Sequence, residues 1–132
     1  MRWINSIDNS EFLRRLFPED PPLEAVGLHR VQLKHDGPIA LFDFDLSDYP
    51  TNPPQRWVEA GANTVRVCLM GIGIRLFDMR GWSTNNIGRL EIDSSSGARI
   101  LFRSAECQIA ASFEFLRIDS VNAYRDGTRT HG

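Results

Sequence analysis

The sequence predicts a mainly β (α+β) fold: an antiparallel β-sandwich or partly open barrel of about seven strands with one short N-terminal helix. Apolar residues recur with a period of two through most of residues 23–124. Clusters of Gly, Pro, Asn and Asp separate these runs, as turns do. No helical pattern alternates with the runs, which disfavours a parallel doubly wound sheet.

The chain is expected to form one domain over residues 1–132. We predict a helix over 9–17, a β core over 23–124 and a polar tail over 125–132, frayed after Asp126. A chain of this length buries enough surface to fold without a disulfide or a metal.

The N-terminal helix is predicted from an apolar stripe at helical spacing. Asp8 is the expected N-cap, and Glu11 three residues later completes a capping-box pattern. Pro18 ends the helix. The stripe, which we expect to close one end of the β core, consists of Phe12, Leu13, Leu16 and Phe17.

The first two strands are predicted on either side of a strong turn signal, Asp36-Gly37. Apolar residues at 26–28 and at 31–33 lie in different phases, so we expect a bulge near His29. The strand after the turn places three apolar side chains on one face, Phe42, Phe44 and Leu46.

A proline-rich corner follows at residues 48–59, because Pro50, Pro53 and Pro54 each lack a backbone donor. Gly61 and Asn63 are turn-compatible residues before the next strand.

In the second half of the chain, Gly71-Ile72-Gly73 breaks an alternating run and predicts a turn or bulge. The last strand has the clearest alternation, with one face made of Cys107, Ile109, Ala111, Phe113 and Phe115.

Composition disfavours several partners. The net charge is −2 with acids and bases mixed along the chain, whereas nucleic-acid binding usually needs a basic face. No apolar run approaches the length of a membrane helix, and the N-terminus lacks the apolar core of a signal peptide. We therefore expect a cytoplasmic protein that binds neither nucleic acid nor membrane.

No catalytic, metal or cofactor motif stands out. His29 and His35 lie about 20 Å apart on one strand, too far to share a metal. Gly71-Ile72-Gly73 lacks the third glycine of a dinucleotide loop. Cys68 and Cys107 are expected to be small buried hydrophobic residues, the alternatives being a disulfide or a reactive thiol.

Acidic residues are the one feature that favours a binding site. Asp43 and Asp45 project from the same face of one strand, about 7 Å apart, and Asp48 and Glu59 flank the corner. Three interpretations are open: a solvated face with arginine neighbours such as Arg66, a face that binds a basic protein, and a divalent-metal site.

Aromatic residues near a charged rim are typical of protein interfaces, which favours Tyr49 and Trp82 as additional contacts. Trp57 is expected in the core.

The central stretch reads Asp36-Gly-Pro-Ile-Ala-Leu-Phe-Asp-Phe-Asp-Leu, followed by Tyr49-Pro, Pro53-Pro54, Trp57 and Gly61-Ala-Asn-Thr-Val. It resembles immunity protein family 50 of bacterial polymorphic toxin systems. The likeness continues to Trp3 at the start and to Ile118 through Tyr124 at the end, so it spans nearly the whole chain.

The resemblance implies a small cytoplasmic, non-enzymatic protein that protects its producer by binding and sterically blocking a cognate toxin. It also implies mainly structural roles for Trp57, Gly61 and Asn63. The expected toxin contacts come instead from the charge and aromatic pattern: Asp43, Asp45, Asp48, Tyr49, Glu59 and Trp82. The alternative functions are a small β-barrel-like module that binds an apolar ligand in its interior, and a metal-dependent hydrolase.

Overall fold

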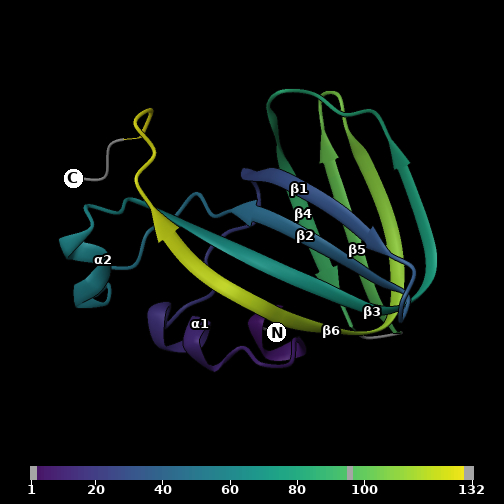
Figure 1. Cartoon of the computed structure of the whole chain (residues 1–132), viewed down its shortest axis with the longest axis horizontal. Coiled ribbons are helices and arrows are strands. Elements are labelled where there is room, and N and C mark those ends of the chain that lie inside the picture. Colours follow the sequence, from purple (N-terminus) through teal and green to yellow (C-terminus); the bar gives the residue numbers. More distant parts are fainter. Residues whose placement is uncertain (1–2, 95–96, 130–132) are drawn as a thin grey trace.

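Six antiparallel strands form one closed barrel in the order β1-β2-β3-β6-β5-β4 (Figure 1). The computed structural model describes residues 3–94 and 97–129. The strands are β1 (Val26–Lys34), β2 (Ile39–Asp45), β3 (Thr64–Arg80), β4 (Asn86–Asp93), β5 (Ala98–Ser104) and β6 (Gln108–Tyr124).

The barrel has one strand fewer than the sequence predicts, because β3 does not end at its glycine pair. It runs for 17 residues beside an equally long β6. Gly73 adopts a positive φ of 71°, and the register with β6 shifts between Ile74 and Leu76. A bulge of this kind bends a strand and changes which side chains face inward. The glycines therefore curve one strand instead of separating two.

A short ladder between the first and fourth strands closes the barrel. Val26 of β1 pairs with Gly88 of β4, and two further pairs follow. Closure corrects the expectation of a sandwich or a partly open barrel. The bulge expected near His29 is confirmed, since the β1–β2 register shifts between Leu28 and Arg30.

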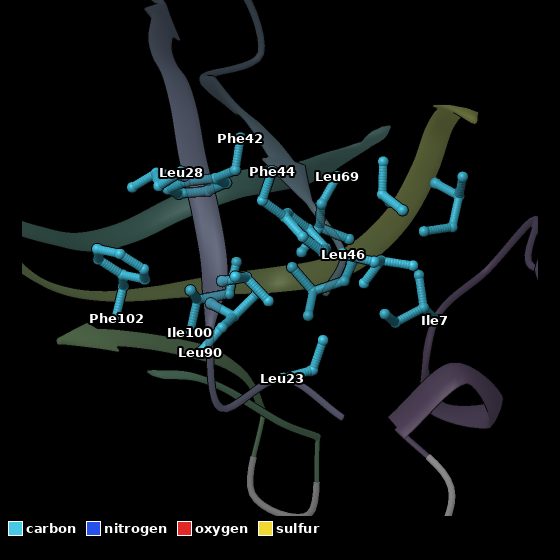
Figure 2. Packing of buried hydrophobic residues seen from close by; sticks show 14 of the residues in the cluster. Ile7, Leu23, Leu28, Phe42, Phe44, Leu46, Leu69, Leu90, Ile100 and Phe102 are labelled. Atoms are coloured by element: carbon cyan, nitrogen blue, oxygen red, sulfur yellow. The ribbon is translucent and has the colours of Figure 1, made fainter. Parts of the chain in front are cut away.

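Packed side chains occupy the interior of the barrel (Figure 2). Phe44 and Phe113 are fully buried, and the ring of Phe42 meets that of Phe113 edge to face with centroids 6.1 Å apart. A barrel of eight strands is just wide enough for side chains to fill it, and six strands enclose less space. The described interior therefore favours a protein that acts through its surface over a carrier of an apolar ligand.

The N-terminal segment covers part of the barrel. It contains a 3₁₀ helix, η1 (Trp3–Ser6), and helix α1 (Glu11–Leu16), which lies within the predicted range. Leu13 and Leu16 are buried in the same cluster as the strand residues, and Figure 1 shows α1 beside β6.

The prediction that Asp8 caps α1 is wrong, because Ser10 occupies the N-cap position. The backbone of Asp8 instead pairs with β6: its N–H donates to the carbonyl of Leu116, and its carbonyl accepts from the N–H of Ile118. Asn9 then turns the chain into the helix with a φ of 61°.

A second α-helix, α2 (Gln55–Glu59), lies in the proline-rich corner, where the sequence analysis predicted no helix. Pro54 precedes its first residue, a place where proline needs no backbone donor. Helix α2 ends in a Schellman motif: Ala62 N–H donates to the Trp57 carbonyl and Gly61 N–H to the Val58 carbonyl. Because α2 has only five residues, it is too short to show helical periodicity in the sequence.

No helix in the described ranges is long and apolar enough to cross a membrane.

Candidate protein-binding surface

Charged side chains form a bonded array on the outside of β1, β2, β3 and β6. Since Phe42 and Phe44 point into the barrel, Asp43 and Asp45 point outward. We call the array the Asp–Arg face; it consists of Arg30, Asp43, Asp45, Arg66 and Tyr124.

Each aspartate of the Asp–Arg face is held by two nitrogens of one arginine. Arg30 donates from Nε to Asp43 at 2.8 Å and from Nη2 at 3.3 Å. Arg66 donates from Nε to Asp45 at 2.7 Å and from Nη2 at 3.1 Å. Bidentate pairs of this kind are strong and geometrically specific. The charges of both carboxylates are therefore compensated by arginines of the same chain. This agrees with the interpretation of a face with arginine neighbours such as Arg66.

Tyr124 completes the bonding of Asp45, which is only 9% exposed. Its hydroxyl donates to Asp45 Oδ2 at 2.5 Å, and the Arg66 guanidinium lies 4.7 Å from the centre of its ring. Burial, followed by the hydrogen bond to the Asp45 carboxylate, raises the pKa of Tyr124 to about 12. The phenol therefore stays protonated at neutral pH and acts as a donor.

Asp43 lies beside Cys68, which is buried although it is on the outside of the sheet. Burial on its own raises the pKa of Asp43, but hydrogen bonds from Arg30 and Cys68 outweigh it and the net pKa is lowered. Burial and the neighbouring Asp43 raise the pKa of the Cys68 thiol to about 12. Both cysteines are buried and free, which confirms the expectation for Cys68 and Cys107.

The other predicted contacts are not members of these ion pairs. Asp48 follows β2 and Glu59 ends α2, and both are exposed. Tyr49 is half-buried, with its ring 6.5 Å from that of Trp57. Trp82 is 48% exposed in the loop after β3, at the opposite end of that strand from Arg66. Trp82 is thus separated by the length of β3 from Asp45, which Arg66 binds near the start of that strand.

The motif residues of the corner have local structural contacts. Trp57 is 5% exposed and meets Phe12 of α1 edge to face at 5.8 Å. Gly61 adopts a φ of 68° at the end of α2, a conformation that favours glycine. These contacts join α1 and α2 around one tryptophan.

Asn63 binds the C-terminal segment. Its Nδ2 donates to the carbonyls of Asp126 and Arg129 at 2.9 and 3.1 Å, and its Oδ1 accepts from the Asp126 N–H. Arg129 in turn donates to the Leu46 carbonyl at 2.7 Å. Residues 125–129 are therefore held against the barrel, contrary to the predicted fraying; residues 130–132 of the predicted tail lie outside the described part of the chain.

Within residues 3–94 and 97–129, no three His, Cys, Asp or Glu side chains are grouped so that they could hold a metal ion. His29 and His35 are exposed on and beside β1, and His35 lies 3.2 Å from Asp36.

Sequence reasoning missed two members of the Asp–Arg face, Arg30 and Tyr124. Arg30 is 13 positions from its partner Asp43, and Tyr124 is 79 positions from Asp45. Only the register of β2 with β1 and of β3 with β6 brings them together. The hairpin signal at Asp36-Gly37 could have suggested the first pairing, whereas no local signal indicates the second.

The packed interior and the bonded exterior define a class: a small, closed antiparallel β-barrel with charged side chains on its outer surface. Within that class, the chain belongs to the immunity protein 50 family, whose sequence model matches residues 9–124. The resemblance inferred from the central stretch is thereby confirmed. Searches of curated proteins and of solved structures gave no match.

Proposed function

We propose that this protein neutralises a cognate bacterial toxin by binding it and covering its active site or substrate groove, without catalysis of its own. The observation that carries this proposal is the immunity-family match over residues 9–124. The closed barrel supports it, because a rigid surface binds without a large cost in conformational entropy. The proposed location is the cytoplasm, where a toxin would otherwise act on its producer.

Complex formation tests the proposal. The toxin domain encoded by the neighbouring gene would be produced as an inactive variant, mixed with this protein and analysed by size-exclusion chromatography with light scattering. We expect a stoichiometric complex that survives dilution. Separate elution of the two folded proteins at micromolar concentration would contradict the proposal.

The predicted acidic contacts differ in whether an arginine of the same chain already binds them. Asp43 and Asp45 are held by arginines, whereas Asp48 and Glu59 are exposed and have no ion pair among the described residues. We therefore propose Asp48 and Glu59 as the acidic contacts that remain free to meet a basic toxin surface, with Tyr49 between them in sequence and Trp82 as a separate aromatic contact.

A further inference from the structure

A row of arginines crosses the outer wall of the barrel over β3, β6, β5 and β4, at the ends of β3 and β6 opposite to those that carry the Asp–Arg face. Arg80 of β3 pairs in register with Gln108 of β6, which pairs with Arg103 of β5, which pairs with Arg89 of β4. All four residues are exposed, and their strand neighbours Leu90, Phe102 and Ile109 are buried. We call these four residues the arginine row.

The arginine row lacks a matching set of negative charges. Arg89 and Arg103 lie directly opposite each other on antiparallel strands, an arrangement that like charges make unfavourable. Arg80 and Arg89 make only exposed pairs along their own strands, with Asp78 at 3.7 Å and Glu91 at 3.4 Å. Arg103 makes no ion pair within the described part of the chain.

The surface around the row is hollowed and partly apolar. In the next row of the sheet Ala110 lies beside Leu101, which is 46% exposed. A hollow of about 360 Å³ covers both rows, and a second hollow, of about 670 Å³, continues past Leu101 toward Arg99. Arginine is enriched in protein-binding surfaces, and the exposed Leu101 adds apolar area beside the arginine row.

We infer that the arginine row binds an acidic segment of the cognate toxin, with Leu101 as the apolar contact beside it. This inference rests on the proposed function. A carboxylate placed between Arg89 and Arg103 would accept hydrogen bonds from both guanidinium groups and relieve their repulsion.

A protein carboxylate fits this surface better than a nucleic acid does. Asp78 and Glu91 flank the neighbouring row and would repel a continuous phosphate backbone. The chain as a whole carries a net charge of −2. The positive charge is therefore local, which suits a short acidic segment.

Single charge reversals test the inference. Arg103→Glu and Arg89→Glu each place opposite charges on the two facing strands, so we expect thermal unfolding at an unchanged or higher temperature. Titration calorimetry with the inactive toxin from the neighbouring gene should show about tenfold weaker binding for each variant, with a shallower dependence on salt. The matched control is Arg117→Glu, an exposed arginine about 30 Å farther along β6 than Gln108, which should bind like the wild type.

Three results would overturn the inference. The first is wild-type toxin affinity in both reversal variants, and the second is an equal loss in the Arg117→Glu control. The third is binding of a random DNA duplex by the wild type that Arg103→Glu abolishes while toxin affinity is unchanged. If the wild type itself does not bind the toxin, the proposed function fails first, so the two failures are distinguishable.

Discussion

At the scale of single residues, Asp45 shows how one carboxylate joins three strands of the barrel. It lies on β2, accepts two hydrogen bonds from Arg66 on β3, and accepts a third from Tyr124 on β6. A buried carboxylate that loses a donor bears the cost of desolvation without full compensation. The contribution of Tyr124 can therefore be measured through the stability of the whole fold.

Replacing Tyr124 by Phe should lower the free energy of unfolding by about 1–3 kcal/mol at neutral pH, because Asp45 loses one donor. Folding raises the pKa of Tyr124 from its ordinary 10.0 to about 12. The stability that it contributes is thus fully present below about pH 10 and is lost as the pH rises toward about 12.

Urea denaturation of the wild type and Tyr124→Phe across this range checks both statements. The difference between the two proteins should shrink above about pH 10. Tyr49, the other of the chain's two tyrosines, also has a raised pKa because it is buried, and it gives both proteins the same background. A difference that stays constant with pH would show that the phenol of Tyr124 does not titrate as described.

The proposed acidic contacts, Asp48 and Glu59, can also be tested by substitution of individual residues. Replacing both Asp48 and Glu59 by Lys should weaken binding of a basic toxin surface about fivefold or more and reduce its salt dependence, because exposed charges act mainly through long-range attraction. Titration calorimetry against the inactive toxin measures the change. The double variant Glu19→Lys with Asp36→Lys, at two other exposed acids, is the matched control. Equal affinities in both double variants would remove the acidic hypothesis.

The outward placement of Asp43 and Asp45 could be predicted, since alternation along one strand determines it. Arg66 could be named as a neighbour from the sequence, but Tyr124 could not, because its pairing with Asp45 depends on the register of distant strands. Of the three interpretations that the sequence left open for Asp43 and Asp45, the structure supports the one with arginine neighbours.

At the scale of elements, the ends of α2 illustrate which local signals were informative. Pro54 and Gly61 are residues typical of the start and the end of a helix, yet the five helical residues, Gln55–Glu59, are too few to show periodicity. In β3, the glycines at 71 and 73 correctly indicated an irregularity. The prediction of a chain break was wrong because β6 continues to pair on both sides of Gly73.

Gly61→Ala tests the helix end. A side chain added at Gly61 has room, since the nearest atom to its Cβ is 3.7 Å away, but the φ of 68° disfavours any residue other than glycine. We expect a loss of about 1–2 kcal/mol in the free energy of unfolding, measured by chemical denaturation. Gly127→Ala, where the added Cβ meets nothing within 4 Å and no positive φ occurs, is the control and should change stability little. Equal effects at the two positions would contradict the backbone argument.

At the scale of the whole molecule, closure of the barrel determines which side chains reach the outer surface. The strand content and the antiparallel arrangement followed from the period-two pattern, but the three residue pairs between β1 and β4 have no signal in the local sequence. Once the sheet closes, its apolar faces point inward and pack against each other (Figure 2). Two charged outer walls remain, the Asp–Arg face with its internal ion pairs and the arginine row with fewer compensating acids.

Binding to a toxin through such an exterior requires no large rearrangement of the barrel. In the proposed function, the inhibitory effect would come from the position of the bound protein on the toxin, and such a steric mechanism suits a packed barrel in the immunity protein 50 family.

Growth rescue tests neutralisation most directly. The active toxin from the neighbouring gene would be induced in a bacterial host with wild-type protein, with no partner, or with an unrelated small β-barrel expressed at the same level. We predict normal growth in the culture that contains the wild-type protein. Growth should stop in the culture without it and in the culture with the unrelated barrel. Arrested growth in all three cultures, with the wild-type protein folded and present in excess, would contradict the proposed immunity function.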